Sequence, residues 1–249
     1  MRELQDAGRI RIGVPTDAPP LGYVGPGGEP RGFSVTLGRM IAQALGVAPE
    51  FRPYPSERLA GLVAIGGADV AFPLAPITED VVRRQSASDP YLVSHQRLLV
   101  RQASDIEDVD DLSGSSACES LDPNTGVPLE ALDPTIEVTV DGLQRCGDRL
   151  ARGRAEAVTA EDFLLAHLRS DLQRSGPATR LTGDSLNTVG YGARVIQKSG
   201  FAQFVSDVFA EAKQDGRWAR AYERWMDDPA GRPPSMTVWE AAALWPRAE

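Results

Sequence analysis

The chain has 249 residues, and its hydrophobic fraction of 42% and charged fraction of 24% are typical of a globular protein with one or two domains. Its formal net charge of -9 disfavours a nucleic-acid partner, because binding to phosphates requires a basic surface. The same charge disfavours attachment to an anionic membrane surface.

Two features of the sequence bear on where in or outside the cell the protein is found. No stretch approaches the roughly 18 consecutive apolar residues of a membrane span. The first residues, Met1 to Gln5, lack the apolar region of a signal peptide. We therefore expect either a cytosolic protein or an exported one whose leader or anchor does not form part of this chain.

The N-terminal segments alternate between predicted strands and helices. Apolar alternation over Arg9 to Val14 predicts a first strand. The segment 15–32 is rich in proline and glycine but has neither phosphate-binding glycine motif, so we predict the tip of a hairpin. Apolar residues at helical spacing over 37–45 predict a helix that ends at Gly46.

A second strand and helix follow. The strand is predicted near 50–52, and Ser56 is expected to cap a helix that ends at Gly66 and Gly67. The order of strands and helices so far favours a mainly parallel sheet with right-handed crossovers.

The stretch from Asp69 to Tyr91 has the order expected of a ligand loop. A short apolar strand opens it, and two prolines then end the strand because proline cannot donate a backbone hydrogen bond. A helix-like start at Thr78 and a turn at Ser88 to Tyr91 follow. In α/β domains such a stretch presents polar groups to a ligand at the end of a sheet.

The remaining two thirds continue the α/β pattern and then become helical. Predicted strands lie near 97–100, 115–120, 136–140 and 155–159, and predicted helices cover 141–152 and begin at 161. Two apolar stripes, over 201–212 and 218–226, predict two further helices. The spacing from Thr237 to Glu240 is that of a capping box and predicts a short final helix.

The chain contains two cysteines, Cys118 and Cys146. Without a C-x-x-C motif or a nearby histidine they make a poor metal site. They are either two buried thiols or one disulfide, and a disulfide would indicate export.

The sequence lacks the usual signatures of catalysis. No nucleophile elbow or metalloprotease motif is present, and we interpret His95 and His167 as structural residues. We therefore predict no catalytic residue, no cofactor and no metal, which favours a binding function.

Five motifs occur in order along the chain, at Gly13 to Tyr23, Gly32 to Leu37, Gly66 to Tyr91, Gly153 to Asp162 and Asp215 to Trp225. Together they resemble the motifs of the extracellular solute-binding proteins of polar amino acid ABC importers, family 3. The first two resemble the family's G-V-x-x-D-x-P-P-x-G-Y and G-F-D-V-D-L, and the third is similar to its T-I-T-x-E-R stretch. The fourth resembles G-R-x-D-A-V-x-T-D-D and the last D-G-T-W-x-x-L-Y-x-K-W.

The resemblance implies an α/β, two-lobed, periplasmic-binding-protein-like fold of type II, with the lobes joined by two crossing strands. Lobe 1 would comprise residues 1–97 and 192–249, and lobe 2 residues 98–191. A small polar ligand would be held in a cleft that closes by a hinge motion. The resemblance also implies a monomer that is extracellular or anchored at the cell surface, such as a lipoprotein or a sensor domain. Its partner would be a membrane permease or receptor.

The glutamate-binding branch of the family carries two cysteines at positions that resemble Cys118 and Cys146. The resemblance therefore implies a disulfide between them, and with it export.

Family ligand contacts map unevenly onto this chain. The family's arginine and first threonine hold the ligand α-carboxylate, and they fall on Val81 and Pro76. Leu74 replaces a small residue, and the family's G-S-T falls near Asp122 to Asn124 without matching. The aspartate that receives the α-ammonium aligns with Glu161. The α-carboxylate site is therefore expected to be degenerate.

Five residues are nevertheless expected to line the ligand site: Asp17, Tyr23, Arg58, Thr78 and Glu161. Arg58 corresponds to an arginine that contacts ligand carboxylate in the branch binding acidic amino acids, although a solvated helix arginine is an equal alternative. Arg83 and Arg84 could act as substitute anion contacts, but such a charge pair more often lies on the outer face of a helix.

Three functions remain open from the sequence. The first is a receptor for a small polar or zwitterionic solute that feeds an importer or acts as a sensor. The second is a degenerate module that binds another protein without a small ligand. The third is an enzyme on the same fold, such as a dehydratase.

Overall fold

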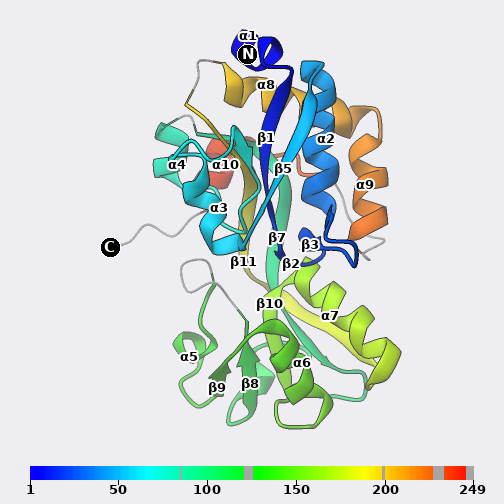
Figure 1. Ribbon diagram of the computed structural model, residues 1–249. Helices are drawn as coiled ribbons and strands as arrows, with labels where there is room; N and C mark the ends of the chain where they lie inside the picture. The colour runs from blue at the N-terminus through cyan, green and yellow to red at the C-terminus, as the bar shows by residue number, and fades with distance from the viewer. Residues whose placement is uncertain (85, 121–125, 198–199, 227–232, 245–249) are drawn as a thin grey trace. The chain divides into compact units, whose positions relative to one another are not determined.

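The computed structural model describes residues 1–84, 86–120, 126–197, 200–226 and 233–244. The chain forms two compact units, which we call unit 1 (Met1–Val93 and Val189–Glu249) and unit 2 (Ser94–Thr188). The chain passes from one unit to the other twice, within the strands β7 (Ala87–Arg101) and β11 (Thr179–Val195) (Figure 1). The structure thus has the expected α/β class, with two strands that join the units.

Unit 1 is built on a sheet in the order β5-β1-β6-β11. Strand β1 runs parallel to both β5 and β6, and β11 runs antiparallel to β6. The parallel pairs follow from the crossover helices α2 and α3, as the alternating sequence pattern predicts. The other elements of unit 1 are α1 (Arg2–Asp6), β1 (Arg9–Pro15), α2 (Phe33–Leu45), β5 (Ala48–Tyr54), α3 (Ser56–Leu62), β6 (Val70–Ala71), α4 (Glu79–Arg83), α8 (Phe201–Gln214), α9 (Arg217–Trp225) and α10 (Val238–Ala243).

A second, three-stranded sheet occupies the predicted hairpin segment. Its strands are β2 (Asp17–Ala18), β3 (Gly22–Val24) and β4 (Pro30–Arg31). Tyr23 pairs with Asp17 on one side and with Arg31 on the other, so the three side chains share one face of this sheet.

The two apolar stripes of the last third form α8 and α9, and both helices pack against α2 (Figure 1). Phe33 of α2 contacts the rings of Tyr91 and Trp218, and all three side chains are buried. The indole Nε1 of Trp218 donates a hydrogen bond of 2.7 Å to the carbonyl of Tyr91. Gly46 ends α2 in the left-handed conformation with φ of 72°, as its position predicted.

Two local expectations were wrong. Pro55, not Ser56, occupies the N-cap position of α3, and the N–H of Ser56 binds the side chain of Asp17 instead. Ser88 to Tyr91 lie in the first part of strand β7 and do not form a turn. The neighbouring strand β11 holds this segment: Val195 N donates to the carbonyl of Ser86, just before β7, and Ala193 N donates to Ser88 Oγ.

The predicted capping box at the end of the chain is present. Thr237 Oγ1 accepts from the N–H of Glu240, and Glu240 Oε2 accepts from the N–H of Thr237. The carboxylate of Asp89 also accepts a hydrogen bond of 2.7 Å from Val238 N. Helix α10 packs against α4 (Figure 1), so this distant segment forms part of unit 1.

Unit 2 is built on the sheet β7-β10-β8-β9. Strand β10 runs antiparallel to β7 and parallel to β8, which in turn is parallel to β9. The elements confined to unit 2 are the 3-10 helix η1 (Asp110–Leu112), β8 (Ser116–Glu119), α5 (Leu129–Leu132), β9 (Glu137–Val140), α6 (Leu143–Ala151), β10 (Ala157–Glu161) and α7 (Asp162–Ser175).

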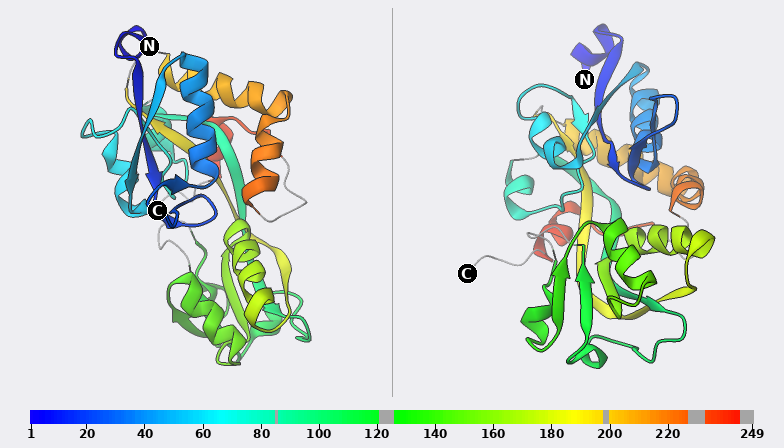
Figure 2. Two further views of the ribbon diagram at one scale, coloured as in Figure 1. Left: turned by 45° about the vertical axis from the view of Figure 1, so that its right-hand side comes forward. Right: turned by 60° about the horizontal axis from the view of Figure 1, so that its bottom comes forward.

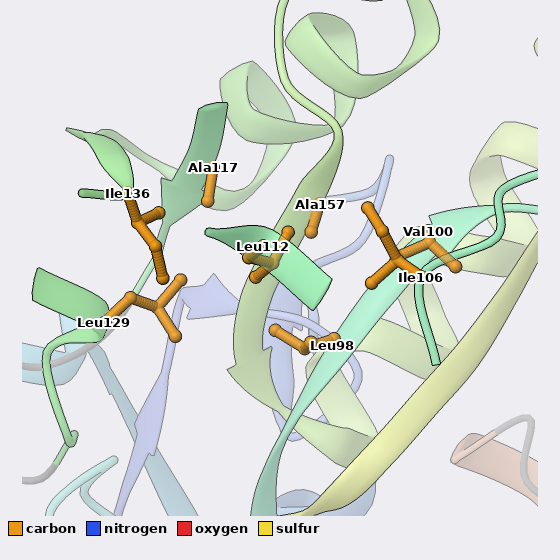
Figure 3. Packing of buried hydrophobic residues seen from close by; sticks show 8 residues of the cluster. All are labelled: Leu98, Val100, Ile106, Leu112, Ala117, Leu129, Ile136 and Ala157. Atoms are coloured by element: carbon orange, nitrogen blue, oxygen red, sulfur yellow. The ribbon is translucent and has the colours of Figure 1, made fainter. Parts of the chain in front are cut away.

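The core of unit 2 contains a cluster of buried aliphatic side chains contributed by the sheet and its connections (Figure 3). Leu98 and Val100 of β7 lie in this cluster with Leu112 of η1 and Leu129 of α5. Helices α6 and α7 lie side by side and both contact β10 (Figure 2). The aliphatic cluster joins the sheet to η1 and α5 and gives unit 2 a hydrophobic core of its own.

Cys118 of β8 and Cys146 of α6 form a disulfide within unit 2. Both cysteines are completely buried, and the bond closes a loop with a sequence separation of 28. The implied disulfide is confirmed, and it fastens α6 to the sheet.

In the described part of the chain, no helix combines the length and apolar character needed to cross a membrane. The described residues also contain no group of three or more side chains that could hold a metal ion.

Candidate functional site

The predicted ligand contacts of unit 1 come from three segments. Asp17 and Tyr23 belong to the small sheet, Arg58 to the first turns of α3, and Thr78 to the end of the loop at 73–78. Asp17 Oδ1 accepts a hydrogen bond of 2.9 Å from Ser56 N. This bond holds the exposed carboxylate of Asp17 at the start of α3, two residues before the exposed Arg58.

Tyr23 is held in place by Trp225, which lies about two hundred residues later in the sequence. Its ring meets that of Trp225 edge to face, with centroids 6.3 Å apart and planes at 76°. The indole Nε1 of Trp225 donates a hydrogen bond of 2.9 Å to Thr36 Oγ1. Trp225 belongs to the closing motif of the sequence, but nothing in that motif indicated that it supports Tyr23.

The 73–78 loop is fixed at two consecutive residues. Pro76 O accepts a hydrogen bond of 2.9 Å from Arg194 Nη2, and Ile77 N donates one of 2.8 Å to Gly190 O. Thr78 occupies the N-cap position of α4, and its side chain makes no capping hydrogen bond. The loop therefore holds Thr78 in place without using its hydroxyl in the helix cap.

Val81 and the two arginines of α4 follow this loop. Val81, where the family's carboxylate-binding arginine is expected, is half-buried. Arg83 pairs with Glu79 at 2.5 Å and Arg84 with Asp80 at 3.0 Å, each one turn earlier on the same helix. Both guanidinium groups thus already have an anionic partner on α4, and their role as substitute anion contacts stays a prediction.

Arg194 is a residue that sequence reasoning missed. It lies in β11 opposite Ala71 of β6 and is 8% exposed. Burial lowers the pKa of its guanidinium to about 10, an effect that the nearby Tyr91 and Asp80 oppose. The available signal was a single arginine within the apolar run from Tyr191 to Ile196.

In unit 2, Glu161 ends β10 and occupies the N-cap position of α7, with 6% of its surface exposed. The next residue, Asp162, accepts hydrogen bonds from Ser94 Oγ at 2.7 Å and from Phe163 N at 2.8 Å. Asp162 therefore ties the start of α7 to β7 and fixes the backbone beside Glu161.

Gln96 of β7 holds the segment that precedes α5. Its amide donates to Val127 O at 2.9 Å and accepts from Val127 N at 2.8 Å. It also donates to the buried Thr159 Oγ1 at 3.2 Å. The positions Asp122 to Asn124, expected at the family's G-S-T, lie outside the described residues.

The two histidines contact neighbouring side chains of unit 2. His95 Nδ1 lies 2.9 Å from Thr188 Oγ1, and His167 Nε2 lies 3.8 Å from Asp171 Oδ2. His95 Nδ1 also lies 3.3 Å from Ser185 Oγ, but the Ser185 hydroxyl donates a hydrogen bond of 2.8 Å to the carbonyl of Asn187, so it is not placed to pass its proton to the imidazole as a nucleophile would.

Comparison with known proteins identifies the family. A model of the bacterial extracellular solute-binding proteins, family 3, matches residues 10–228. The chain belongs to this family. The family is one of binding proteins, and its members are extracellular or periplasmic.

This family 3 chain is 25% identical over 236 residues to the ABC transporter glutamine-binding protein GlnH of Bacillus subtilis (strain 168), covering 91% of the chain and 85% of GlnH. It is 25% identical over 170 residues to the glutamate-binding protein GluB of Corynebacterium efficiens, covering 64% of the chain and 57% of GluB. The crystal structure of a mutant of ArgBP from T. maritima has a TM-score of 0.68 and 26% identity, with 91% of this chain and 99% of ArgBP covered. The likeness confirms the two-lobed type II fold class expected from the motifs.

Proposed function

We propose that this family 3 member captures a small polar or zwitterionic, amino-acid-like solute outside the cell and delivers it to an ABC importer. The observation that carries the proposal is the family match over residues 10–228. Relatives of similar length bind glutamine and L-cystine, and a shorter match is to a glutamate-binding protein. These three solutes share an α-ammonium group and an α-carboxylate group.

The ammonium group is the part of such a solute that this chain is best equipped to bind. Asp17 on unit 1 and Glu161 on unit 2 supply carboxylates, which pair with a cation through charge-assisted hydrogen bonds. Tyr23 supplies an aromatic face, on which a cationic or apolar group can rest. Thr78 supplies a hydroxyl, and Arg58 is proposed to bind an anionic group of the solute.

The α-carboxylate is the part that this chain binds less well than its relatives. Val81 cannot donate the bidentate hydrogen bonds of an arginine. Losing such a charge-assisted contact costs about 3 kcal/mol of binding free energy, which lowers the affinity about a hundredfold. We therefore expect ordinary α-amino acids in the usual pose to bind weakly.

Several finer properties belong to the same proposal. Unit 1 and unit 2 would act as the two lobes, and the protein would bind its solute without transforming it. It would be a monomer, held at the cell surface by a lipid anchor or as the sensor part of a membrane protein. The disulfide between Cys118 and Cys146 supports an oxidising, extracellular location.

Thermal-shift measurements and calorimetry with a panel of solutes test the proposal. The panel contains glutamine, glutamate, cystine and arginine, together with betaines and amines that lack an α-carboxylate. We expect at least one member of the panel to raise the melting temperature, because a ligand of the folded state must do so. Glutamine and glutamate should not bind with sub-micromolar affinity.

The alternatives have different outcomes in this experiment. If no solute raises the melting temperature, the module that binds another protein without a small ligand is favoured. If a solute binds and its NMR spectrum then changes to that of a product, the protein is an enzyme. Asp17→Asn and Glu161→Gln should each weaken the binding of the solute found, since each variant removes one carboxylate charge.

A further inference from the structure

A cavity of about 440 Å³ lies within unit 1, between the end of α3, helix α4 and the end of β11. None of the five predicted ligand contacts lines it. Its walls are formed by Ala60, Val63, Ala64, Asp80, Val81, Arg84, Ser86, Arg194, Val195, Ile196 and Gln197. The volume is within the range of about 300–1,000 Å³ that is usual for small-molecule sites.

The charges around this cavity do not cancel. Two arginines, Arg84 and Arg194, and one acid, Asp80, line it. Asp80 is already paired with Arg84, at 3.0 Å. Asp80 also attracts Arg194, which forms no ion pair with any described residue, so the lining holds one more positive than negative group.

Hydrogen bonds do not satisfy Arg194 either. Its Nη2 donates to Pro76 O at 2.9 Å, whereas its Nη1 is shielded from solvent and has no hydrogen-bond partner among the described residues. A buried donor that has lost its water and found no acceptor is costly. A guanidinium in this state is well suited to an anion, because it presents several N–H groups in one plane.

The rest of the lining indicates what kind of anion fits. Val63, Val81 and Val195 give the cavity apolar walls, and Ala60 of α3 and Ala64 just after α3 are exposed. A doubly charged and fully hydrated anion would leave these walls unused and would exceed the single uncompensated charge. A carboxylate with a short hydrocarbon chain matches both the charge and the walls.

We propose that this cavity is a second small-molecule site, which binds a small aliphatic monocarboxylate through the guanidinium of Arg194. The carboxylate accepts from the N–H groups that Pro76 leaves unused, and the hydrocarbon chain lies against Val63, Val81 and Val195. Binding requires a side-chain adjustment that opens Nη1 to the cavity. None of the five predicted solute contacts lines this site, although Val81, where the family's carboxylate-binding arginine is expected, does.

Calorimetry and ligand-observed NMR with sodium butanoate test this assignment. Wild-type protein should bind butanoate but not butanamide or butylamine, which have the same chain without the negative charge. Arg194→Met keeps much of the side-chain volume and removes the charge. It should weaken butanoate binding about a hundredfold, as expected when charge-assisted hydrogen bonds are lost.

Two further variants test whether butanoate binds in this cavity and not elsewhere on α3 or α4. Arg83→Gln is the matched control, because Arg83 lies on the same helix, pairs with Glu79 and does not line the cavity. It should leave butanoate binding unchanged. Ala60→Phe adds a bulky side chain at the exposed edge of the lining and should weaken binding while Arg194 stays in place.

The proposal fails if wild-type protein does not bind butanoate at millimolar concentrations, or if Arg194→Met binds it as well as wild type. It also fails if inorganic phosphate binds more tightly than butanoate. If circular dichroism shows that Arg194→Met does not fold, butanoate binding by Ala60→Phe is compared with that by Arg83→Gln. Equal binding by these two variants then overturns the proposal. The amino-acid panel, repeated with Ala60→Phe, shows separately whether the proposed solute site still operates.

Discussion

The carboxylate of Asp17 accepts a hydrogen bond from the backbone N–H of Ser56 at 2.9 Å, although the two residues are 39 positions apart in sequence. The first N–H groups of a helix have no partner within the helix, so an outside carboxylate stabilises them. Asp17 therefore holds the start of α3 beside the small sheet. This structural role exists alongside its proposed contact with a ligand ammonium group.

Substitution of Asp17 separates these two roles. Asp17→Ala removes the acceptor and should lower the free energy of unfolding by about 1 kcal/mol, the usual cost of losing such a cap. Asp17→Asn keeps an acceptor oxygen and should remain close to wild type in urea denaturation. Both variants should lose affinity for a cationic solute. Equal stability of the Ala and Asn variants would contradict the capping role.

Val81→Arg should restore part of the family's carboxylate contact. The new guanidinium would extend from α4, and we expect affinity for glutamine or glutamate to rise by up to about a hundredfold. Calorimetry measures the change. Ile65→Arg is the matched control, because Ile65 is 82% exposed at another place in unit 1 and the variant adds the same charge. An equal gain in both variants would indicate a general charge effect instead.

The disulfide of unit 2 predicts that the protein has no free thiol and that removing the bond lowers its stability. Denatured wild-type protein should show no reactive thiol, because both cysteines of the chain form the bond. Replacing both with alanine should lower the free energy of unfolding by about 3 kcal/mol, as expected for a loop of this length. Two titratable thiols in denatured wild type, or an unchanged midpoint in urea, would refute this prediction.

The buried Glu119 of β8 predicts a pH dependence of stability. Burial raises the pKa of its carboxyl above the ordinary 4.5, an effect that the hydrogen bond from Leu129 N opposes and the negative charge of Glu130 adds to. Between pH 4.5 and the raised pKa of the folded state, Glu119 is still largely protonated in the folded protein but largely ionised in the unfolded chain. Stability attributable to Glu119 therefore falls as pH rises through this window and stays lower above it.

Glu119→Gln tests this sign. The amide can still accept from Leu129 N, which lies 2.5 Å from Glu119 Oε1, but it carries no charge. The free energy of unfolding of the variant should equal that of wild type below pH 4.5 and should exceed it at neutral pH. Urea denaturation at several pH values measures the difference. Glu130→Gln, an exposed neighbour, should give a smaller change in the same direction.

Much of the fold followed from local patterns in the sequence. The apolar period of 201–212 placed α8, Gly46 marked the end of α2, and Thr237 with Glu240 formed the capping box of α10. Such features depend on residues within one or two turns of each other, so the chain itself displays them. The family motifs extended this reading to the whole α/β architecture.

The details of the site depended on contacts between distant residues. The cap of α3 comes from Asp17 rather than from Ser56, and the 73–78 loop is held by Arg194, which is 118 positions from Pro76. No local spacing encodes either contact. Each arises because the sheet brings together strands that are far apart in sequence, and buried polar groups must then find partners there.

The sequence by itself therefore determined the class of fold and the family, because the motifs that indicate them are local in the chain. Only the tertiary structure decided that Ser88 to Tyr91 belong to strand β7 and that Arg194 is buried with one nitrogen that has no hydrogen-bond partner among the residues described. The physical reason is that periodicity and capping act between near neighbours. Burial and hydrogen-bond satisfaction are instead properties of the packed chain.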